Sequence, residues 1–195
     1  MKNKKTITTV PELSELEEEL KRVKYQNRYK RVLTSTAGTL AVIAAVAVLI
    51  ATLLMPVLQI NGASMNPALY DGDVVATVKA ADVKQGDVVA FYYNNKILVK
   101  RVIAMPGEWV DIDKEGNVYV NDILLDEPYL AERDVGECDI KLPYQVPDNR
   151  IFVMGDHRSV SVDSRSTAVG CVSEEQLIGK LVFRVWPLKA FGTVR

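Results

Sequence analysis

The sequence predicts a mostly β protein, in which an extracytoplasmic all-β domain of curled antiparallel sheets follows one N-terminal transmembrane helix and a short cytoplasmic helix. Three observations favour this architecture. No charged residue occurs between Arg31 and Asp71, so a long segment is apolar enough to enter a bilayer. Six basic residues and no acidic ones lie from Lys21 to Arg31. Beyond residue 58, short runs of β-branched and aromatic residues alternate with turn signals, as in all-β domains.

The first 31 residues are the predicted cytoplasmic segment. Residues 1–8 are expected to be disordered, and a helix start is predicted at Thr9, with Pro11 in its first turn and Glu12 three residues on. Apolar residues then recur every three to four positions, which indicates a short amphipathic helix: Leu13, Leu16, Leu20 and Val23. This helix could pair with a partner, lie on the membrane, or be a solvated lead into the anchor; two heptads are too few to indicate a coiled coil.

The apolar segment is predicted to be a retained membrane anchor over residues 32–57. Val32 to Leu54 would form roughly 34 Å of helix at about 1.5 Å per residue, enough for a hydrocarbon core of about 30 Å. A secretory signal peptide is the alternative, but its apolar core spans about 7–15 residues after a short basic region, whereas 31 residues come first here. A buried core helix would need apolar neighbours on every side.

The charge distribution predicts the orientation of this anchor. Residues 1–31 hold nine basic and five acidic residues, while the remainder carries a net charge of −5. Because basic flanks stay in the cytoplasm, residues 58–195 are expected outside it, in a single-pass protein of the cell membrane. No basic face with interleaved aromatic residues occurs, so we expect no nucleic-acid partner.

The segment from residue 58 is predicted to form one domain of short strands. Asn94-Asn95 and Glu115-Gly116 are expected at hairpin tips, and Glu174–Ile178 could form a helical turn. The expected strands are Val74–Val78, Asp87–Tyr93, Ile97–Ala104, Trp109–Ile112, Val118–Val120, Ile151–Met154 and Leu181–Trp186.

Two cysteines, Cys138 and Cys171, lie 33 positions apart. They form no CxxC motif and have no His or Cys partners at metal-ligand spacing, so no metal site is expected. A disulfide outside the cytoplasm and two free thiols both remain open, because the sequence does not fix the distance between the two residues.

Ser64 is the first candidate for chemistry, since it lies in Gly62-Ala63-Ser64-Met65-Asn66-Pro67, a few residues after the anchor. Gly62 permits unusual backbone angles and Pro67 stiffens the turn, which can expose the hydroxyl and leave backbone N–H groups free for an oxyanion. By itself the pattern is weak, because most such serines are ordinary turn residues. A serine nucleophile also needs a base.

His157, the only histidine, is one possible base, and a Ser–His–Asp triad with Ser64 is conceivable. Asp156 is adjacent in sequence, however, and neighbours on extended chain point to opposite sides, so another aspartate would have to orient the ring. An isolated histidine in a Gly-Asp turn is more often a hydrogen-bonding loop residue.

Lys100 is the stronger candidate for the base. Leu98, Lys100 and Val102 share one face of a predicted strand, and an inward lysine between two aliphatic residues would lose hydration. Desolvation would lower the lysine pKa from about 10.4 toward about 7–8, where it can act as a general base. A surface lysine on an edge strand is the alternative and the common case.

A third cluster follows a predicted strand: Gly155-Asp156-His157-Arg158-Ser159-Val160-Ser161-Val162-Asp163-Ser164-Arg165. Its two acids and two arginines could form a hydrogen-bonded network that shapes a loop. As a solvated charge run it would need no function, so its value lies in occurring with the other two clusters.

In this order, the three blocks resemble the motif set of bacterial type I signal peptidases of the compact, single-anchor type. The blocks are Gly62–Pro67, Lys100–Glu108 and Gly155–Arg158 with Ser161–Arg165, and the resemblance covers about Pro56 to Trp186. The anchor also matches. Each block alone is modest evidence, whereas the ordered set behind an anchor is highly specific.

The resemblance implies a serine–lysine dyad, with Ser64 as nucleophile and Lys100 as general base. Ser161 matches the serine whose hydroxyl helps to hold the lysine, and the Ser64 N–H would hold the oxyanion. Also implied are a supporting ion pair and apolar pockets that accept Ala-x-Ala before the scissile bond. The ion pair is Asp163 with Arg165, near Arg101 and Asp156; the pocket positions are Ile60, Met65, Leu98 and Val99, with Gly62 where some members offer a second, hydroxyl donor.

Three positions depart from the family pattern. His157 stands where Asn is usual, Glu108 replaces the commoner Asp after Pro-Gly, and the glycine after Ser164-Arg165 comes late, at Gly170. The first two lie outside the dyad and should be tolerated, whereas the third leaves the conformation of loop 166–171 open.

The sequence therefore predicts a membrane-bound serine endopeptidase that removes N-terminal signal peptides from exported preproteins, without metal or cofactor. Its expected partners are those preproteins and the lipid bilayer, and a monomer is expected. Two other functions stay open: a non-catalytic membrane-anchored assembly module on the same fold, and a processing peptidase dedicated to one substrate. A self-cleaving serine–lysine regulator would need a DNA-binding region, for which residues 1–31 are too short and too mixed in charge.

Overall fold

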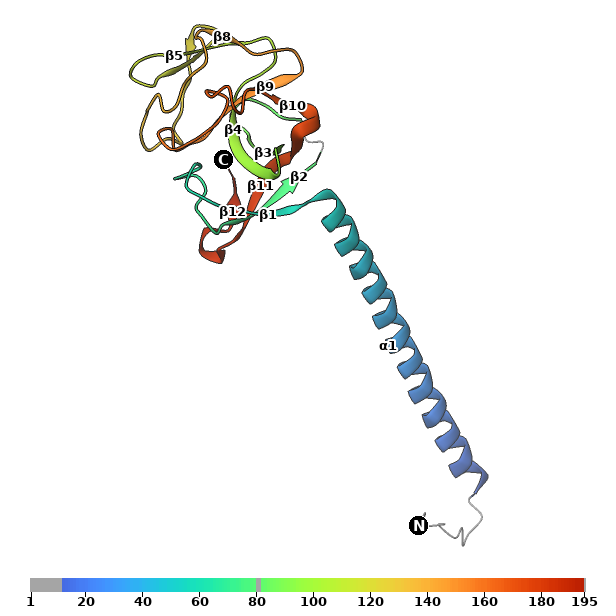
Figure 1. Ribbon diagram of the computed structural model, residues 1–195. Helices are drawn as coiled ribbons and strands as arrows, with labels where there is room; N and C mark the ends of the chain where they lie inside the picture. Colours follow the sequence, from blue (N-terminus) through green and yellow to red (C-terminus); the bar gives the residue numbers. More distant parts are fainter. Residues whose placement is uncertain (1–11, 80–81, 195) are drawn as a thin grey trace. The chain divides into compact units, whose positions relative to one another are not determined.

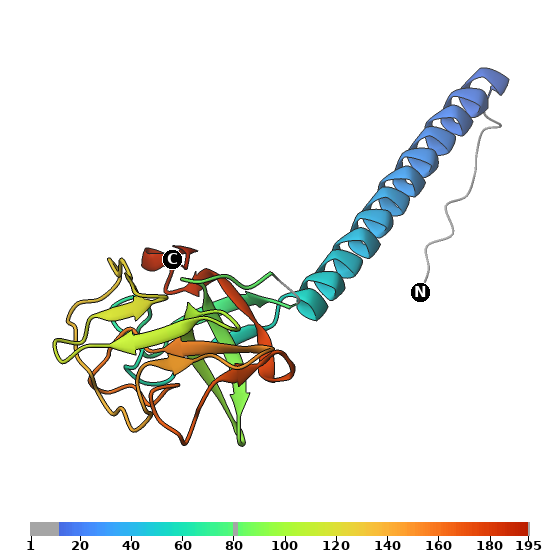
Figure 2. The same ribbon diagram turned by 90° about the horizontal axis from the view of Figure 1, so that it is seen from above.

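The structure is a computed structural model that describes residues 12–79 and 82–194. It divides into two units, Met1–Ala51 and Thr52–Arg195. Figure 1 shows a long helix in the first unit and the labelled strands in the second. Figure 2 shows the strands of the second unit from above, gathered into one body.

The helix α1 (Leu13–Leu54) is continuous over 42 residues. The predicted amphipathic helix and the predicted anchor therefore lie on one continuous helix. The expected helix start at Thr9 and the expected disorder of residues 1–8 lie outside the described residues. By length and composition this helix is able to cross a membrane.

Hydroxyl groups within α1 are satisfied by the helix itself. Thr34 Oγ1 donates to the Lys30 carbonyl at 2.9 Å, and Thr39 Oγ1 donates to the Ser35 carbonyl at 3.0 Å. Such back-bonding leaves no hydroxyl of these two residues unpaired, which suits a helix surrounded by hydrocarbon.

The second unit contains two antiparallel sheets. The larger sheet has the order β1-β2-β11-β3-β4-β9-β10, with β12 paired to β11, and the smaller has the order β7-β6-β5-β8. The larger sheet consists of β1 (Val57–Gln59), β2 (Val74–Val78), β3 (Val88–Tyr93), β4 (Lys96–Ala104), β9 (Arg150–Met154), β10 (Val172–Ser173), β11 (Leu177–Trp186) and β12 (Gly192–Thr193). The smaller consists of β5 (Trp109–Ile112), β6 (Val118–Val120), β7 (Ile123–Leu124) and β8 (Tyr144–Gln145).

All seven predicted strands are present, and both predicted hairpins join the expected pairs. The strand β11 begins earlier than predicted, at Leu177, and it shifts register next to both β2 and β3. A 3-10 helix, Glu174–Gln176, stands where a helical turn was expected. The strands that the sequence missed have two or three residues each, too few to show an alternating pattern: β1, β7, β8, β10 and β12.

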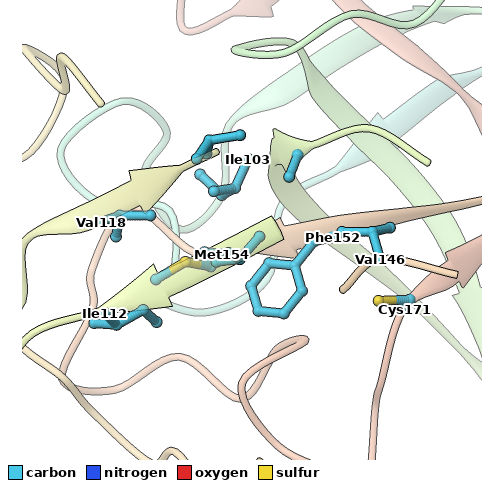
Figure 3. Packing of buried hydrophobic residues seen from close by; sticks show 10 residues of the cluster. Ile103, Ile112, Val118, Val146, Phe152, Met154 and Cys171 are labelled. Atoms are coloured by element: carbon cyan, nitrogen blue, oxygen red, sulfur yellow. The ribbon is translucent and has the colours of Figure 1, made fainter. Parts of the chain in front are cut away.

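The strand β4 reaches all three hydrophobic clusters of the second unit. Ile103 belongs to the cluster drawn in Figure 3, where side chains of the smaller sheet meet those of β9. Val99 packs against a second cluster, while Leu98 and Val102 belong to a third. Because side chains alternate along a strand, β4 is packed on both faces, and this packing fixes the position of Lys100 in its middle.

Candidate active site

Ser64 lies in a turn within the long connection between β1 and β2, residues 60–73. The Asn66 N–H donates to the Ala63 carbonyl at 3.1 Å, and the Leu69 N–H donates to the Met65 carbonyl at 2.9 Å. Met65 and Leu69 are buried in the second hydrophobic cluster, whereas Ser64 is partly exposed. The turn thus holds the hydroxyl at the surface by burying the residue that follows it.

Gly62 adopts a backbone angle φ of +94°, which L-residues with a side chain rarely adopt. Its N–H donates to Asp71 Oδ1 at 2.7 Å, so it is not free to bind an oxyanion. Among the described residues, no hydrogen bond engages the Ser64 N–H. The Ser64 N–H, which was predicted to bind the oxyanion, is therefore available.

Lys100 approaches Ser64 from β4. It lies opposite Val89 and shares its face of β4 with Leu98 and Val102, which both pack in the third cluster. The lysine is only 3% exposed, and its Nζ donates to Ser64 Oγ at 2.7 Å. The structure thus brings together two side chains that are 36 positions apart in sequence.

Burial lowers the pKa of Lys100 from 10.5 to about 8. The charges of Asp163 and Asp156 act in the opposite direction, and that of Arg165 adds to the lowering. Desolvation prevails because no carboxylate pairs directly with the ammonium among the described residues. About a tenth of such a lysine is neutral at pH 7, and the neutral form can accept a proton from a hydroxyl.

His157 does not contact the hydroxyl of Ser64. Its backbone N–H donates to the Ser64 carbonyl at 3.0 Å, and its ring Nδ1 lies 3.3 Å from the Ala63 carbonyl. The neighbouring Asp156 carboxylate is held by Arg101 and so does not orient the ring. The geometry favours the lysine over the histidine as partner of Ser64.

Arg101 and Asp156 form a buried, two-pronged ion pair beside Lys100. Arg101 Nε lies 2.8 Å from Asp156 Oδ1, and Nη2 lies 2.7 Å from Oδ2. Arg101 Nη1 also donates to the Gly86 carbonyl at 2.8 Å. Because the guanidinium is fixed on several sides, the residue next to Lys100 cannot shift easily.

Asp163 and Arg165 form a second buried pair, with both oxygens 2.8 Å from guanidinium nitrogens. Asp163 also accepts the Gly155 N–H at 2.9 Å. Burial alone would raise the pKa of Asp163, but the hydrogen bonds and charge of Arg165 outweigh it and lower that pKa. The carboxylate therefore stays ionised in the interior.

Comparison with known proteins shows the family of the chain. Residues 33–186 match the family model described as "Signal peptidase, peptidase S26". The chain belongs to this signal peptidase family. It is thus a serine peptidase, and its function is the cleavage of signal peptides.

Several relatives of the peptidase carry the same name. Signal peptidase IB of Staphylococcus aureus is 39% identical over 152 residues, which cover 68% of this chain and 78% of the relative. Signal peptidase I of Bacillus amyloliquefaciens is 33% identical over 179 residues, which cover 86% of this chain and 96% of the relative. A crystal structure of a signal peptidase I from Enterococcus faecalis superposes with a TM-score of 0.45 at 28% identity, covering 52% of this chain and 97% of the other.

Ser161 of the peptidase is buried, at 2% exposure, beside Gly155. Its hydroxyl meets no partner within hydrogen-bond geometry, although it faces Asp163 closely enough to help lower the pKa of that carboxyl. No hydrogen bond between Ser161 and Lys100 is present among the described residues. The contact expected from the family resemblance therefore stays a prediction.

The predicted pocket residues lie on both sides of β4. Ile60 and Met65 are buried, and Val99 packs against them in the second cluster. Leu98 packs in the third cluster, on the face of β4 that carries Lys100. All four thus lie close along the chain to the reactive pair, with the exposed Gly62 at the turn.

Glu108 and Gly170, two positions that depart from the family pattern, each close a turn in the structure. Glu108 accepts the Met105 N–H at 2.7 Å and closes the turn after β4. In loop 166–171, which the sequence left open, the Gly170 N–H donates to the Ser166 carbonyl at 2.9 Å, and Ser164 Oγ donates to the Gly170 carbonyl at 2.8 Å. The late glycine therefore closes a defined turn.

Other features lie away from the reactive pair. A cavity of about 690 Å³ is lined by residues such as Met105, Ile151 and Leu177, none of which is a predicted site residue. Cys138 and Cys171 are free thiols, and Cys171 is buried in the first cluster. Within residues 12–79 and 82–194, no group of His, Cys, Asp or Glu could hold a metal ion.

From the sequence, no role was assigned to the buried Glu127 or the half-buried Tyr129, and Arg158 was placed only within a general hydrogen-bonded network. Arg158 forms an ion pair with Glu127, and the Tyr129 ring stacks on Arg101 at 3.9 Å. No local signal marks the first pair, because Glu127 and Arg158 lie 31 positions apart in sequence.

Proposed function

We propose that the chain cleaves signal peptides from exported preproteins after small residues, through an acyl-enzyme on Ser64 with Lys100 as general base. The observation that carries this proposal is the 2.7 Å contact between Lys100 Nζ and Ser64 Oγ. The lowered pKa of Lys100 supports it, because a base must be partly neutral at the working pH.

The reaction begins when neutral Lys100 accepts the Ser64 proton while Oγ attacks the carbonyl carbon of the scissile peptide bond. The tetrahedral intermediate then collapses, the C–N bond breaks, and Lys100 protonates the departing amine. An acyl-enzyme ester remains. Lys100, neutral again, takes a proton from a water molecule, which attacks the ester carbonyl. The lysine then returns that proton to Ser64 Oγ as the ester C–O bond breaks.

The oxyanion is bound by the Ser64 N–H. Support comes from its lack of another partner in the described part of the chain, and from the engagement of the Gly62 N–H by Asp71. One aligned donor in a desolvated site is worth about 3–4 kcal/mol of transition-state stabilisation. A second donor would have to come from the bound substrate or from a small movement of the turn.

Supporting residues hold the lysine in place. Arg101 with Asp156, and Arg165 with Asp163, form rigid pairs around β4 and the loop after β9. Ser161, buried beside Gly155, helps to hold the lysine through its hydroxyl. These residues position the dyad and do not take part in the covalent steps.

Specificity for small residues arises from close packing beside Ser64. Ile60 and Met65 are buried against Val99, so any pocket that opens there is shallow and apolar. Leu98 contributes apolar surface on the other face of β4, the face that carries Lys100. Alanine side chains would fit such a surface, whereas a larger side chain would have to displace core residues.

The chain acts at the membrane surface, with residues 1–31 cytoplasmic, residues 32–57 in the bilayer and residues 58–195 outside the cytoplasm. The apolar part of α1 and the basic residues before it support this topology. The continuity of α1 supports an N-terminal part that extends away from the bilayer in line with the anchor. The enzyme works as a monomer in this scheme.

The test is cleavage of an Ala-x-Ala preprotein by Ser64→Ala, Lys100→Ala and His157→Asn enzymes in membranes. We expect the first two to lose at least a thousandfold in kcat and the third to keep most of its rate. Trapping of an ester on Ser64 by a reactive lactam gives an independent readout. An active Lys100→Ala together with an inactive His157→Asn would overturn the dyad in favour of a triad.

A further inference from the structure

Residues 127–136, which we call the strap, lie within the connection from β7 to β8 and form no regular strand. This segment contains no residue of the three motif blocks. It nevertheless contacts three buried arginines that surround the dyad: Arg101, Arg158 and Arg165.

The first contact joins the strap to the loop that holds the nucleophile. Glu127, only 5% exposed, forms an ion pair with Arg158 through both guanidinium Nη atoms. Arg158 Nε in turn donates to the Gly155 carbonyl at 3.0 Å. The same loop contacts the nucleophile directly, because the His157 N–H donates to the Ser64 carbonyl.

The second contact joins the strap to the strand that carries the base. The Tyr129 ring lies 3.9 Å from the Arg101 guanidinium carbon, a cation–π geometry. Tyr129 Oη donates to Glu127 Oε1 at 2.9 Å, so one hydroxyl links the two contacts. Burial and the Glu127 charge raise the pKa of Tyr129, which keeps this hydroxyl protonated as a donor.

The third contact is made by the backbone of the strap. The Val135 carbonyl accepts Arg165 Nη1 at 2.6 Å. At Gly136, with φ of +60°, a Cβ atom would lie 2.4 Å from the Arg158 carbonyl oxygen and 2.5 Å from Arg165 Nη1. The strap therefore packs against the arginine cluster at van der Waals distance and leaves little room for water.

We propose that the strap sets the Ser64–Lys100 distance, with Glu127 and Tyr129 as positioning residues for the peptidase reaction. Glu127 acts through Arg158 on the loop that bonds to Ser64, and Tyr129 acts through Arg101, the neighbour of Lys100. Neither residue touches the reacting atoms. The inference rests on the proposed dyad. It adds the strap as a third segment that supports the dyad, besides the turn with Ser64 and the strand with Lys100.

The physical basis is the cost of an unpaired buried charge. Without the Glu127 carboxylate, Arg158 would be a buried cation with no acid, which is strongly unfavourable. The arginine would then move toward water, and the loop at Gly155 and His157 would move with it. Water entering near Lys100 would raise its pKa back toward 10.5, since burial is what lowers it.

The experiment compares full-length Glu127→Gln with Asp126→Asn, which changes an exposed carboxylate one position earlier. With an Ala-x-Ala peptide in detergent, we expect Glu127→Gln to lower kcat at least tenfold and to change KM less than twofold. The pH at half-maximal kcat should rise by about one unit. Asp126→Asn should match the parent enzyme in all three quantities.

A milder variant, Tyr129→Phe, keeps the ring on Arg101 and removes only the hydroxyl bond to Glu127. It should lower kcat several-fold and shift the pH midpoint in the same direction, even if Glu127→Gln fails to fold. The proposal is overturned if Tyr129→Phe matches Asp126→Asn in kcat and pH midpoint. It is also overturned if a folded Glu127→Gln loses rate only in proportion to its loss of folded protein.

The experiments distinguish a wrong strap proposal from a wrong dyad proposal. If Lys100→Ala stays active, the dyad is wrong and the strap proposal fails with it. If Lys100→Ala is inactive while both strap variants behave like Asp126→Asn, the dyad stands and only the strap proposal is wrong.

Discussion

The Lys100 ammonium donates a 2.7 Å hydrogen bond to Ser64 Oγ from a side chain that is only 3% exposed. This contact joins the middle of β4, the strand that reaches all three hydrophobic clusters, to a turn in the connection between β1 and β2. Lys100 Nζ and Ser64 Oγ can exchange the roles of donor and acceptor, because a neutral amine accepts the proton that the hydroxyl donates. The protonation state of one lysine therefore controls whether Ser64 can attack.

The rate of cleavage should depend on pH through Lys100. Its pKa of about 8 means that the active neutral form predominates above pH 8 and declines tenfold per pH unit below it. We expect kcat/KM to rise with pH to a plateau, with a midpoint near 8. The measurement is cleavage of a peptide with no titrating groups of its own between pH 6 and 10. A midpoint of about 6.5, the ordinary pKa of a histidine, would instead indicate that His157 is the base.

Replacing Lys100 with methionine should stabilise the folded protein. The pKa lowered from 10.5 to about 8 means that folding disfavours the charged lysine by roughly 3 kcal/mol at pH 7. Between pH 8 and 10.5 the unfolded chain binds more protons at this site than the folded one, so parent stability rises with pH in that window. Lys100→Met should therefore unfold at higher denaturant concentration than the parent at pH 7.

This stability difference should shrink as the pH approaches 10.5. Denaturant unfolding of both proteins in detergent, followed by tryptophan fluorescence at pH 7 and pH 10, measures it. Equal stabilities at pH 7 would mean that water reaches Lys100 in the folded state.

Much of this site could be predicted because its residues lie in local patterns. Alternation placed Leu98, Lys100 and Val102 on one face, and the structure packs the two aliphatic residues in a common cluster. Turn residues gave the β3–β4 and β5–β6 hairpins. Such features depend on neighbours a few positions away, and these are visible in a single sequence.

The remainder depends on contacts that no local pattern records. Glu127 meets Arg158 across 31 positions, from a segment without regular secondary structure. The Gly62 N–H is engaged by Asp71, although sequence reasoning left the glycine backbone available as a donor. The length of α1 also went beyond local patterns, because a change from polar to apolar composition near Arg31 does not show whether the backbone continues as helix.

Gly155 should tolerate no side chain. A Cβ atom there would lie 2.2 Å from Ser161 Oγ and 2.5 Å from the Ser64 carbonyl oxygen, closer than real contacts allow. Because the carbonyl belongs to the nucleophile, relief of this clash would move Ser64. We expect Gly155→Ala to lower kcat at least a hundredfold, since displacement of a reacting atom by about 1 Å costs that much.

The matched control for this substitution is Gly192→Ala, because nothing lies within 4 Å of a Cβ at Gly192. It should leave peptide cleavage unchanged. Cleavage assays on both variants, with thermal unfolding to confirm that each is folded, provide the comparison. Equal kcat values for the two variants would show that the 155 loop can yield without disturbing Ser64.

Large apolar side chains at the end of β11 and beyond should bind the bilayer surface. Trp186, Leu188 and Phe191 are 55%, 71% and 63% exposed. In the sheet order, β11 pairs with β2 and β2 pairs with β1, the first strand after α1. Burying one such side chain in lipid is worth about 1.5–3 kcal/mol, so its loss should weaken docking of the anchored second unit on the bilayer surface roughly tenfold or more.

The substitutions Leu188→Ser and Phe191→Ser test this attachment, with Ile123→Ser as the control. Ile123 is 73% exposed but lies on β7 of the smaller sheet. With a preprotein embedded in vesicles, the first two variants should cleave about tenfold more slowly than the parent, and the control should not. With a short soluble peptide all should cleave alike, because that substrate does not need the membrane. Equal losses on both substrates would mean that these residues support folding and not membrane contact.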